Sequence, residues 1–354
     1  MIKILLTIIQ VGIVIVPLFL GILLVFRSSA AYEDSHQNSK AAAWGISRRR
    51  YALLMRLLGA LLLCVSASAA YSLFFEQEQK VDDEVRDFWK DIEDKSKDAF
   101  PKAAMLLGAA IAIPTRMSST RFPGKPLAKL GSKTVIEHVY ERCMKSELAE
   151  RAVILTDSPQ IMDFAKQMGA EAIMTSPQCS SGTERIIEAF DEIGAEFVVN
   201  VQGDEPFISP NLIDALIQKR AETSCDLITA ASRIIDVAAL ENENVVKVLR
   251  AENGRAIYFS RSPLPFIRGV REREKWLEKA AYWRHIGIYG YSRKALNLYA
   301  KFGPCALEKC EMLEQLRFIS NGMQFEVVQT QYESIGIDTP ADLVAAEEFL
   351  KRQS

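Results

Sequence analysis

Residues 198–206 read VVNVQGDEP, a short apolar run followed at once by a glycine, two acidic residues and a proline. The run 197–201 has the length and composition of a buried strand, and Gly203 lets a ligand approach the backbone closely. Asp204 would lie just beyond the carboxyl end of that strand, where a carboxylate is suited to hold Mg²⁺ together with phosphate oxygens. This stretch predicts a ligand site at one edge of a sheet.

The chain around this stretch alternates short apolar runs with segments of helical periodicity from about residue 106 onward. The expected strands are 108–113, 152–155, 172–174, 197–201, 227–231, 245–249, 256–259, 285–291 and 325–329. The expected helices are 135–145, 160–168, 183–192, 211–222, 294–301, 307–321 and 340–351. Such alternation predicts an α/β fold whose mixed, mainly parallel sheet carries helices on both faces.

A basic loop follows the first expected strand. Residues 113–127 read IPTRMSSTRFPGKPL and place Arg116, Arg121 and Lys125 among serine, threonine, glycine and proline. Backbone N–H groups and fixed positive charge in such a loop can bind a polyphosphate. The segment lacks the P-loop pattern GxxxxGK(S/T), which excludes that class of site. An ordinary basic surface loop is the alternative, but the shaped turn around Lys125 favours phosphate binding.

A second carboxylate of interest, Asp338, lies in the motif GIDTP at residues 336–340. From these residues alone it is best explained as the N-cap of a helix that begins near Pro340. A second ligand for Mg²⁺ is the alternative.

The composition narrows the function classes. The 354 residues include 43 Lys and Arg against 45 Asp and Glu, and this near balance argues against electrostatic binding of nucleic acid. The six cysteines form no CxxC pair and there are three histidines, so the sequence gives no zinc site.

The first hundred residues differ from the rest. Residues 4–26 carry no charge and are long enough, at about 1.5 Å per residue, for a helix to cross a bilayer, and 57–75 form a weaker apolar stretch. We expect 1–75 to be a membrane anchor with one or two transmembrane segments, 76–102 a charged amphipathic helical linker, and 103–354 the α/β domain.

Several separate blocks together resemble the cytidylyltransferases that activate 3-deoxy-manno-octulosonate (Kdo), the CMP-Kdo synthetases. In family order they are STRFPGKPL from 119, SGTER from 181, VNVQGDEP from 199, VVKV from 245, YFSRSPLP from 258, RHIGIYGY from 284, EMLEQLR from 311 and GIDTP from 336. The resemblance covers residues 108–350 and implies a Rossmann-like nucleotide-diphospho-sugar transferase fold.

The resemblance also implies roles for individual residues. Lys125, Arg116 and Asp204 would be catalytic, and Asp204 and Asp338 would hold Mg²⁺, which reverses the preference for a cap at Asp338. The nucleotide pocket would consist of Arg116, Ser119, Lys125, Ser181, Gly182, Thr183, Arg185 and Gln202. Without the resemblance, Ser181 or Thr183 could simply cap a helix.

The sugar side would consist of Gln202, Arg261, His285, Tyr289, Glu308 and Gln315. Arg261 suits a bidentate grip on the sugar carboxylate, although a structural ion pair is equally compatible with its position. His285 and Tyr289 are four apart on an expected strand and therefore point to one face, although a buried histidine is more often structural. Glu308, Glu311 and Gln315 would follow one edge of the helix 307–321, with Met312, Leu316 and Ile319 on its apolar face.

The implied reaction transfers CMP from CTP to the anomeric hydroxyl of Kdo, giving CMP-Kdo and pyrophosphate for lipopolysaccharide synthesis. Alternatives are the same chemistry on 8-amino-Kdo or a sialic-acid-type sugar, and a membrane-anchored nucleotide-binding scaffold without catalysis. The resemblance implies a homodimer. Basic residues between the two apolar stretches suggest that this connection is cytoplasmic, which would place the rest of the chain outside if both stretches span the membrane and in the cytoplasm if only the first does. The need for CTP favours the cytoplasmic face of an inner membrane for the α/β domain, against part of this charge pattern.

Overall fold

The computed structural model describes residues 108–119 and 121–353. The chain divides into two units after Leu107, and all the described residues belong to the second. The expected membrane spans 4–26 and 57–75 and the linker 76–102 lie outside the described residues. Within the described residues, no helix is long and apolar enough to cross a membrane.

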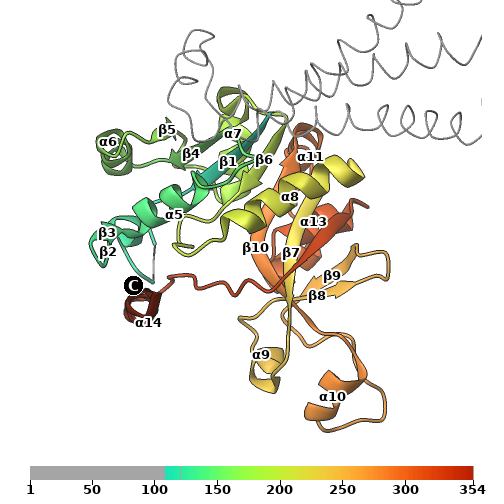
Figure 1. Cartoon of the computed structure of the whole chain (residues 1–354). Helices are drawn as coiled ribbons and strands as arrows, with labels where there is room; N and C mark the ends of the chain where they lie inside the picture. The colour runs from blue at the N-terminus through green and yellow to red at the C-terminus, as the bar shows by residue number, and fades with distance from the viewer. Residues whose placement is uncertain (1–107, 120, 354) are drawn as a thin grey trace, which may run out of the picture. The chain divides into compact units, whose positions relative to one another are not determined.

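A mixed sheet forms the centre of this unit (Figure 1). Its strands run in the order β11-β7-β10-β6-β1-β4-β5, and β8 extends it from β10 to β9. Strands β1, β4, β5 and β6 pair in parallel, as do β7 and β11, whereas β10 is antiparallel to both β6 and β7. The strands are β1 Ala109–Pro114, β2 Lys129–Leu130, β3 Lys133–Thr134, β4 Arg151–Thr156, β5 Glu171–Met174, β6 Phe197–Asn200, β7 Leu227–Arg233, β8 Lys247–Arg250, β9 Ala256–Ser260, β10 Trp283–Ser292 and β11 Phe325–Thr330.

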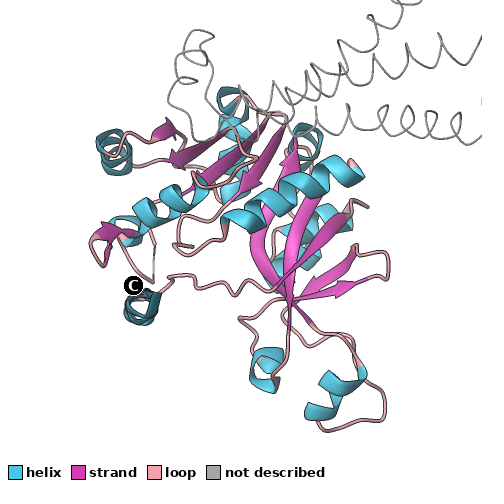
Figure 2. Ribbon diagram, viewed as in Figure 1, coloured by secondary structure: helices cyan, strands magenta, loops and turns pink. Residues whose placement is uncertain are grey.

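Helices cover both faces of the sheet, as the alternation in the sequence predicts (Figures 1 and 2). Helices α7, α11 and α13 pack on one face, where their apolar side chains form a single cluster with those of β1, β4 and β10, while α5 and α8 lie on the other. The helices are η1 Lys125–Leu127, α5 Val135–Cys143, α6 Pro159–Gln167, α7 Gly182–Ile193, α8 Pro210–Thr223, α9 Val237–Glu241, α10 Glu274–Lys279, α11 Arg293–Tyr299, α12 Ala306–Glu311, α13 Gln315–Ser320 and α14 Pro340–Gln353.

Local sequence signals explain where many helices begin. Thr134 and Glu137 form a reciprocal capping box on α5, and Ser181 and Ser292 accept hydrogen bonds from the first turns of α7 and α11. Proline occupies the first turn of α6 and α8, where its missing N–H has no intrahelical partner to lose. Helices α6, α7 and α8 follow β4, β5 and β6 and so start at the carboxyl edge of the sheet, where the expected site lies, whereas α11 starts at the opposite edge, because Ser292 pairs with Phe197 at the start of β6.

Each strand expected from the sequence is present, with ends shifted by at most two residues. The expected single helix 307–321 is wrong, because the chain forms α12 and α13 with a break after Glu311. Met312 adopts a left-handed conformation, with φ of 53°, and its side chain is 76% exposed rather than part of an apolar face. Glu308, Glu311 and Gln315 therefore do not share one helix edge. The short elements α9, α10 and β2–β3 were not predicted.

Candidate active site

A pocket of about 270 Å³ opens beside the carboxyl ends of β1 and β6. Most of the predicted nucleotide and metal residues line it, although they come from distant parts of the chain. The lining consists of Pro114, Thr115, Arg116, Ser119, Arg121, Lys125, Pro126, Cys179, Ser180, Ser181, Gly182, Arg185, Gln202, Gly203, Asp204 and Asp338. Parallel strands bring their carboxyl ends to one edge, which is where ligands of open α/β sheets bind.

Lys125 links the two predicted metal ligands. Its Nζ atom lies 2.6 Å from Oδ2 of Asp204 and 3.2 Å from Oδ1 of Asp338. The lysine is only 9% exposed, whereas the Asp338 side chain is 50% exposed and also meets Arg121 at 3.2 Å. Two carboxylates separated by 134 positions in the sequence therefore converge on one buried ammonium group.

Glycines let the loops around Lys125 approach one another. A Cβ atom on Gly203 would lie 2.8 Å from the Cβ of Thr115, so a side chain there would push the loop after β6 away from the loop after β1. Gly124 precedes η1 with φ of 74°, a left-handed conformation that glycine adopts without strain. Pro126 then fixes the turn that carries Lys125 into the pocket.

Asp338 does not cap the helix that follows it. Thr339 does so instead, because its Oγ1 accepts a hydrogen bond from the N–H of Asp342 at 3.3 Å. The carboxylate of Asp342 in turn accepts from the N–H groups of Thr339 and Asp338, at 2.8 and 3.0 Å. This arrangement leaves the Asp338 carboxylate facing Lys125 and Arg121, and the cap interpretation of Asp338 is wrong.

The pocket carries an excess of positive charge. The cationic side chains of Arg116, Arg121, Lys125 and Arg185 outnumber its two carboxylates. Arg116 is exposed and makes no ion pair within 108–119 and 121–353, which leaves its charge available to a ligand. Ser119 lines the same wall and accepts a hydrogen bond from the N–H of Phe122 at 3.3 Å. Such a lining favours a polyphosphate over a neutral ligand.

The N-terminus of α7 forms the opposite wall. Ser181 is its N-cap, accepting from the N–H of Glu184 at 3.2 Å, and Gly182 also lines the pocket. Thr183 is fully buried and does not line the pocket, since its hydroxyl lies 3.5 Å from that of Tyr291. The Arg185 guanidinium is held by Thr175 and by Asp157, the latter at 3.1 Å.

The predicted sugar residues other than Gln202 do not line this pocket. His285 and Tyr289 lie on β10 with ring centroids 5.3 Å apart, and both are buried. His285 Nε2 lies 2.9 Å from the Thr229 hydroxyl, and burial lowers the pKa of this histidine to about 3. The Tyr289 hydroxyl lies 3.4 Å from Oε1 of Gln315, whose buried Nε2 has no hydrogen-bond partner in the described part of the chain.

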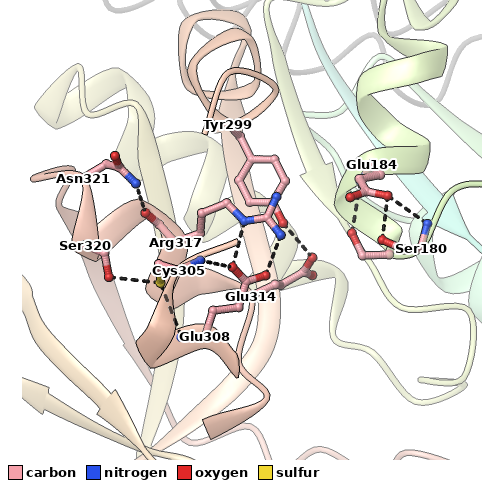
Figure 3. A network of polar contacts seen from close by, with 10 residues as sticks. Ser180, Glu184, Tyr299, Cys305, Glu308, Glu314, Arg317, Ser320 and Asn321 are labelled. Atoms are coloured by element: carbon pink, nitrogen blue, oxygen red, sulfur yellow. Dashed lines mark hydrogen bonds and ion pairs between the residues drawn. The ribbon is translucent and has the colours of Figure 1, made fainter. Parts of the chain in front are cut away.

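Arg261 and Glu308 contact other parts of the fold. The Arg261 guanidinium donates to the backbone carbonyls of Glu311 and Glu243, at 2.7 and 3.0 Å, and to no carboxylate of the residues that the structure describes. Glu308 accepts two hydrogen bonds from Arg317, at 2.6 and 2.8 Å, and forms a capping box with Cys305 (Figure 3).

The polar contacts around this ion pair continue through Tyr299 to Glu314 (Figure 3). The Arg317 guanidinium lies 4.2 Å from the Tyr299 ring centre, and the Tyr299 hydroxyl lies 3.4 Å from the Glu314 carboxylate. Burial raises the pKa of Glu314, while hydrogen bonds with the hydroxyls of Ser181 and Thr183 act in the opposite direction. Helices α12 and α13 are thereby connected to the start of α7.

Three polar residues beside the pocket escaped the sequence-based prediction of site residues. Arg121 was part of the basic loop expected to bind phosphate but was not assigned as a site residue; it lies 3.2 Å from Asp338. Asn200, at the end of β6, is fully buried and its Nδ2 has no hydrogen-bond partner among the described residues. Burial raises the pKa of Glu205 to about 7, and the adjacent Asp204 carboxylate acts in the same direction. Asn200 and Glu205 flank Asp204 within VVNVQGDEP, so proximity to that motif was the available signal.

Known proteins are similar to this chain in both sequence and fold. A family model for cytidylyltransferases matches residues 110–325. The 3-deoxy-manno-octulosonate cytidylyltransferase of Trichlorobacter lovleyi is 43% identical over 250 residues, covering 68% of this chain and 97% of that protein. The protein of the same name from Porphyromonas gingivalis is 42% identical over 246 residues, covering 68% of this chain and 96% of that protein.

A solved structure of CMP:2-keto-3-deoxy-manno-octonic acid synthetase complexed with CTP superposes with a TM-score of 0.66 at 34% identity. The match covers 70% of this chain and the whole of that one. The Rossmann-like sheet, the sequence relatives and this structural neighbour agree with one another. The chain belongs to the 3-deoxy-manno-octulosonate cytidylyltransferase family.

Proposed function

We propose that this protein transfers CMP from CTP to the anomeric hydroxyl of Kdo, forming CMP-Kdo and pyrophosphate. The observation that carries this proposal is the convergence of Asp204, Asp338 and Lys125 in a cationic pocket between the loops after β1 and β6. The relatives' shared name and the CTP complex of the structural neighbour support the same substrates.

In the proposed reaction, the anomeric oxygen of the sugar acid attacks the α-phosphorus of CTP. A bond forms between that oxygen and phosphorus, the bond from phosphorus to the bridging oxygen breaks, and pyrophosphate leaves with the bonding electrons while the hydroxyl proton is released. Lys125 and Arg116 would offset the charge that develops on the leaving group. Ser119, Ser181, Gly182 and Gln202 line the pocket where the nucleotide would lie.

The donor set fits Mg²⁺. Asp204 and Asp338 present two carboxylates to one point, now bridged by Lys125, and Mg²⁺ is commonly held by one or two carboxylates together with substrate phosphates. Asp204 and Asp338 would hold the ion, which would stabilise the charge on the attacking and leaving oxygens. Lys125 would turn from the two carboxylates toward phosphate oxygens when Mg²⁺ and the nucleotide are both bound.

On the sugar side we propose Gln202, Arg261, His285, Tyr289, Glu308 and Gln315. The Nε2 of Gln315 has no hydrogen-bond partner within 108–119 and 121–353, and this supports the assignment, because a buried donor without a partner is costly unless a ligand satisfies it. The Nδ2 of Asn200, which also has no partner in this part of the chain, lies on the strand that pairs with β10 at Tyr289, between this set and the pocket in the sheet.

We further propose that residues 1–75 hold the enzyme at the cytoplasmic face of a membrane and that the α/β domain forms a homodimer. The uncharged stretch 4–26 supports the first proposal, and the second is what the resemblance of the sequence motifs implies. Fractionation of cells that express the full chain or residues 101–354 tests the anchor. We expect the full chain in the membrane fraction; its recovery in the supernatant would contradict the anchor.

Pyrophosphate release by the full chain with CTP and Mg²⁺ tests the reaction, with Kdo, 8-amino-Kdo and a sialic acid as separate acceptors. We expect turnover with Kdo to exceed that with the others. Faster turnover with another acidic sugar would keep the chemistry and replace the substrate.

A further inference from the structure

The loop that carries Asp338 has no regular secondary structure of its own. Residues 331–339 connect β11 to α14 as an extended segment (Figure 2), so neither element's internal hydrogen bonds fix the position of this carboxylate. Asp342 holds the C-terminal end of the segment through the N–H groups of Asp338 and Thr339. The remainder of the segment needs other contacts to keep Asp338 facing Lys125.

Glu205 provides such contacts from the residue directly after Asp204. Each of its carboxylate oxygens accepts a hydrogen bond from one hydroxyl of the segment. Oε1 accepts from the Ser334 hydroxyl, and Oε2 accepts from the Tyr332 hydroxyl at 3.3 Å. Gly336 passes close to the same carboxylate, and a Cβ atom there would lie 3.2 Å from Oε1. The backbone adds one hydrogen bond alongside, from the N–H of Ile337 to the carbonyl of Asp204 at 2.9 Å.

The two consecutive acids therefore face different partners. Asp204 faces Lys125, and Glu205 faces the segment that brings Asp338 to the same lysine. We propose that Glu205 is a positioning residue that clamps the segment 332–338 through Tyr332 and Ser334 and so sets the placement of Asp338 opposite Asp204. This inference rests on the proposed function, because it assigns the clamp to the carboxylate pair that would hold Mg²⁺.

The hydroxyl partners give the sharpest test, because replacing them leaves both pocket carboxylates unchanged. Tyr332→Phe, Ser334→Ala and their combination remove the two hydrogen bonds singly and together. Tyr282→Phe and Ser320→Ala serve as matched controls, since they remove hydroxyl hydrogen bonds to the Pro265 carbonyl and to Cys305, in other parts of the fold. Glu205→Gln keeps an acceptor oxygen and is the conservative variant, whereas Glu205→Ala removes the clamp.

Two readouts are needed. In the metal-free protein, hydrogen exchange of the Ile337 amide reports whether the segment is held, and we expect exchange about tenfold faster in the double variant and unchanged in the controls. The Mg²⁺ concentration at which CTP binding is half-maximal, followed by calorimetry, reports the placement of Asp338. We expect it to rise about tenfold in the double variant and in Glu205→Ala, and by a smaller factor in Glu205→Gln.

Unchanged exchange at Ile337 would overturn the clamp. Faster exchange with an unchanged Mg²⁺ requirement would overturn its role in placing Asp338 and leave Glu205 a purely structural residue. Turnover with Kdo, measured separately on the unaltered chain, decides the proposed function independently of either result.

Discussion

The pocket around Lys125 opens at the carboxyl ends of β1 and β6, whereas His285, Tyr289 and Gln315 are buried against one another around β10. In the pocket, Lys125 pairs with the carboxylates of Asp204 and Asp338. A bound cation could take the place of the lysine in these pairs, and a nucleotide phosphate the place of the carboxylates. Around β10, aromatic rings pack against one another and hydrogen bonds join His285 to Thr229 and Tyr289 to Gln315, while Gln315 Nε2 has no hydrogen-bond partner among the described residues. A change in the pocket should therefore alter chemistry first, and a change around β10 should alter stability as well as sugar binding.

The largest expected effect is that of Lys125→Met. The variant keeps the length of the side chain but loses the charge between Asp204 and Asp338, so we expect kcat/KM for CTP to fall about 10³-fold. Lys133→Met is the matched control, because Lys133 forms a surface ion pair with Glu141. Comparable losses in the two variants, measured by pyrophosphate release, would remove the distinction between pocket and surface lysines.

Arg261→Lys should have the next largest effect. Lysine cannot reproduce the two directions in which Arg261 donates to Glu311 and Glu243, so the cationic group proposed to bind the sugar carboxylate would shift. We expect KM for the sugar to rise about tenfold with little change in KM for CTP. Arg255→Lys, on the ion pair with Glu326, is the control. An equal rise in both KM values would show that Arg261 serves the fold rather than the sugar side.

Glu308→Gln separates a direct sugar contact from a structural ion pair. Both its carboxylate oxygens bond to Arg317, and both side chains are largely buried, so we expect the free energy of unfolding to fall by about 3 kcal/mol in urea titrations. Glu241→Gln, at the more exposed pair with Arg273, should cost less than about 1 kcal/mol. A rise in the sugar KM in Glu308→Gln that Arg317→Lys does not share would place Glu308 itself on the sugar.

The smallest expected effect at neutral pH is the one that His285 has on stability, because it grows only as the pH falls. Burial lowers its pKa in the folded chain to about 3, whereas the unfolded value is near 6.5. The neutral ring therefore contributes stability above pH 6.5, and this contribution is lost as the pH falls towards 3, by at most about 1.4 kcal/mol per pH unit. Unfolding of His285→Gln should depend less on pH between 6.5 and 4. Parallel curves for the two proteins would contradict the burial of an uncharged His285.

Most of the sheet could be predicted from the sequence, because each strand is a separate apolar run between turn signals. The break between α12 and α13 could not, since Leu313 and Leu316 continue the apolar spacing through it and both are buried. The left-handed backbone conformation of Met312, which ends α12, depends on tertiary packing, so helical periodicity does not predict it.

The carboxylates of the pocket could be found from motifs, but their partners could not. Asp204 and Lys125 stand out within glycine-rich turns, and family resemblance was needed to prefer Asp338 as a ligand over Asp338 as a cap. Two sets of contacts join segments that are far apart in the sequence: Glu205 with Tyr332 and Ser334, and Arg185 with Asp157. A third contact, Glu308 with Arg317, joins α12 to α13 across the break between them. No local pattern specifies such pairs, because they arise only when the sheet brings its loops together.

We propose that the carboxylates just beyond β6 and just before α14, those of Asp204 and Asp338, support transfer of CMP to Kdo. The most direct test of this proposal is pyrophosphate release by the full chain and by Asp204→Asn, with saturating CTP, Mg²⁺ and Kdo. We expect turnover by the unaltered chain and a loss of about 10²–10³-fold in the variant, with the fold intact by circular dichroism. Undiminished turnover in Asp204→Asn, or none in the unaltered chain with Kdo, would contradict it.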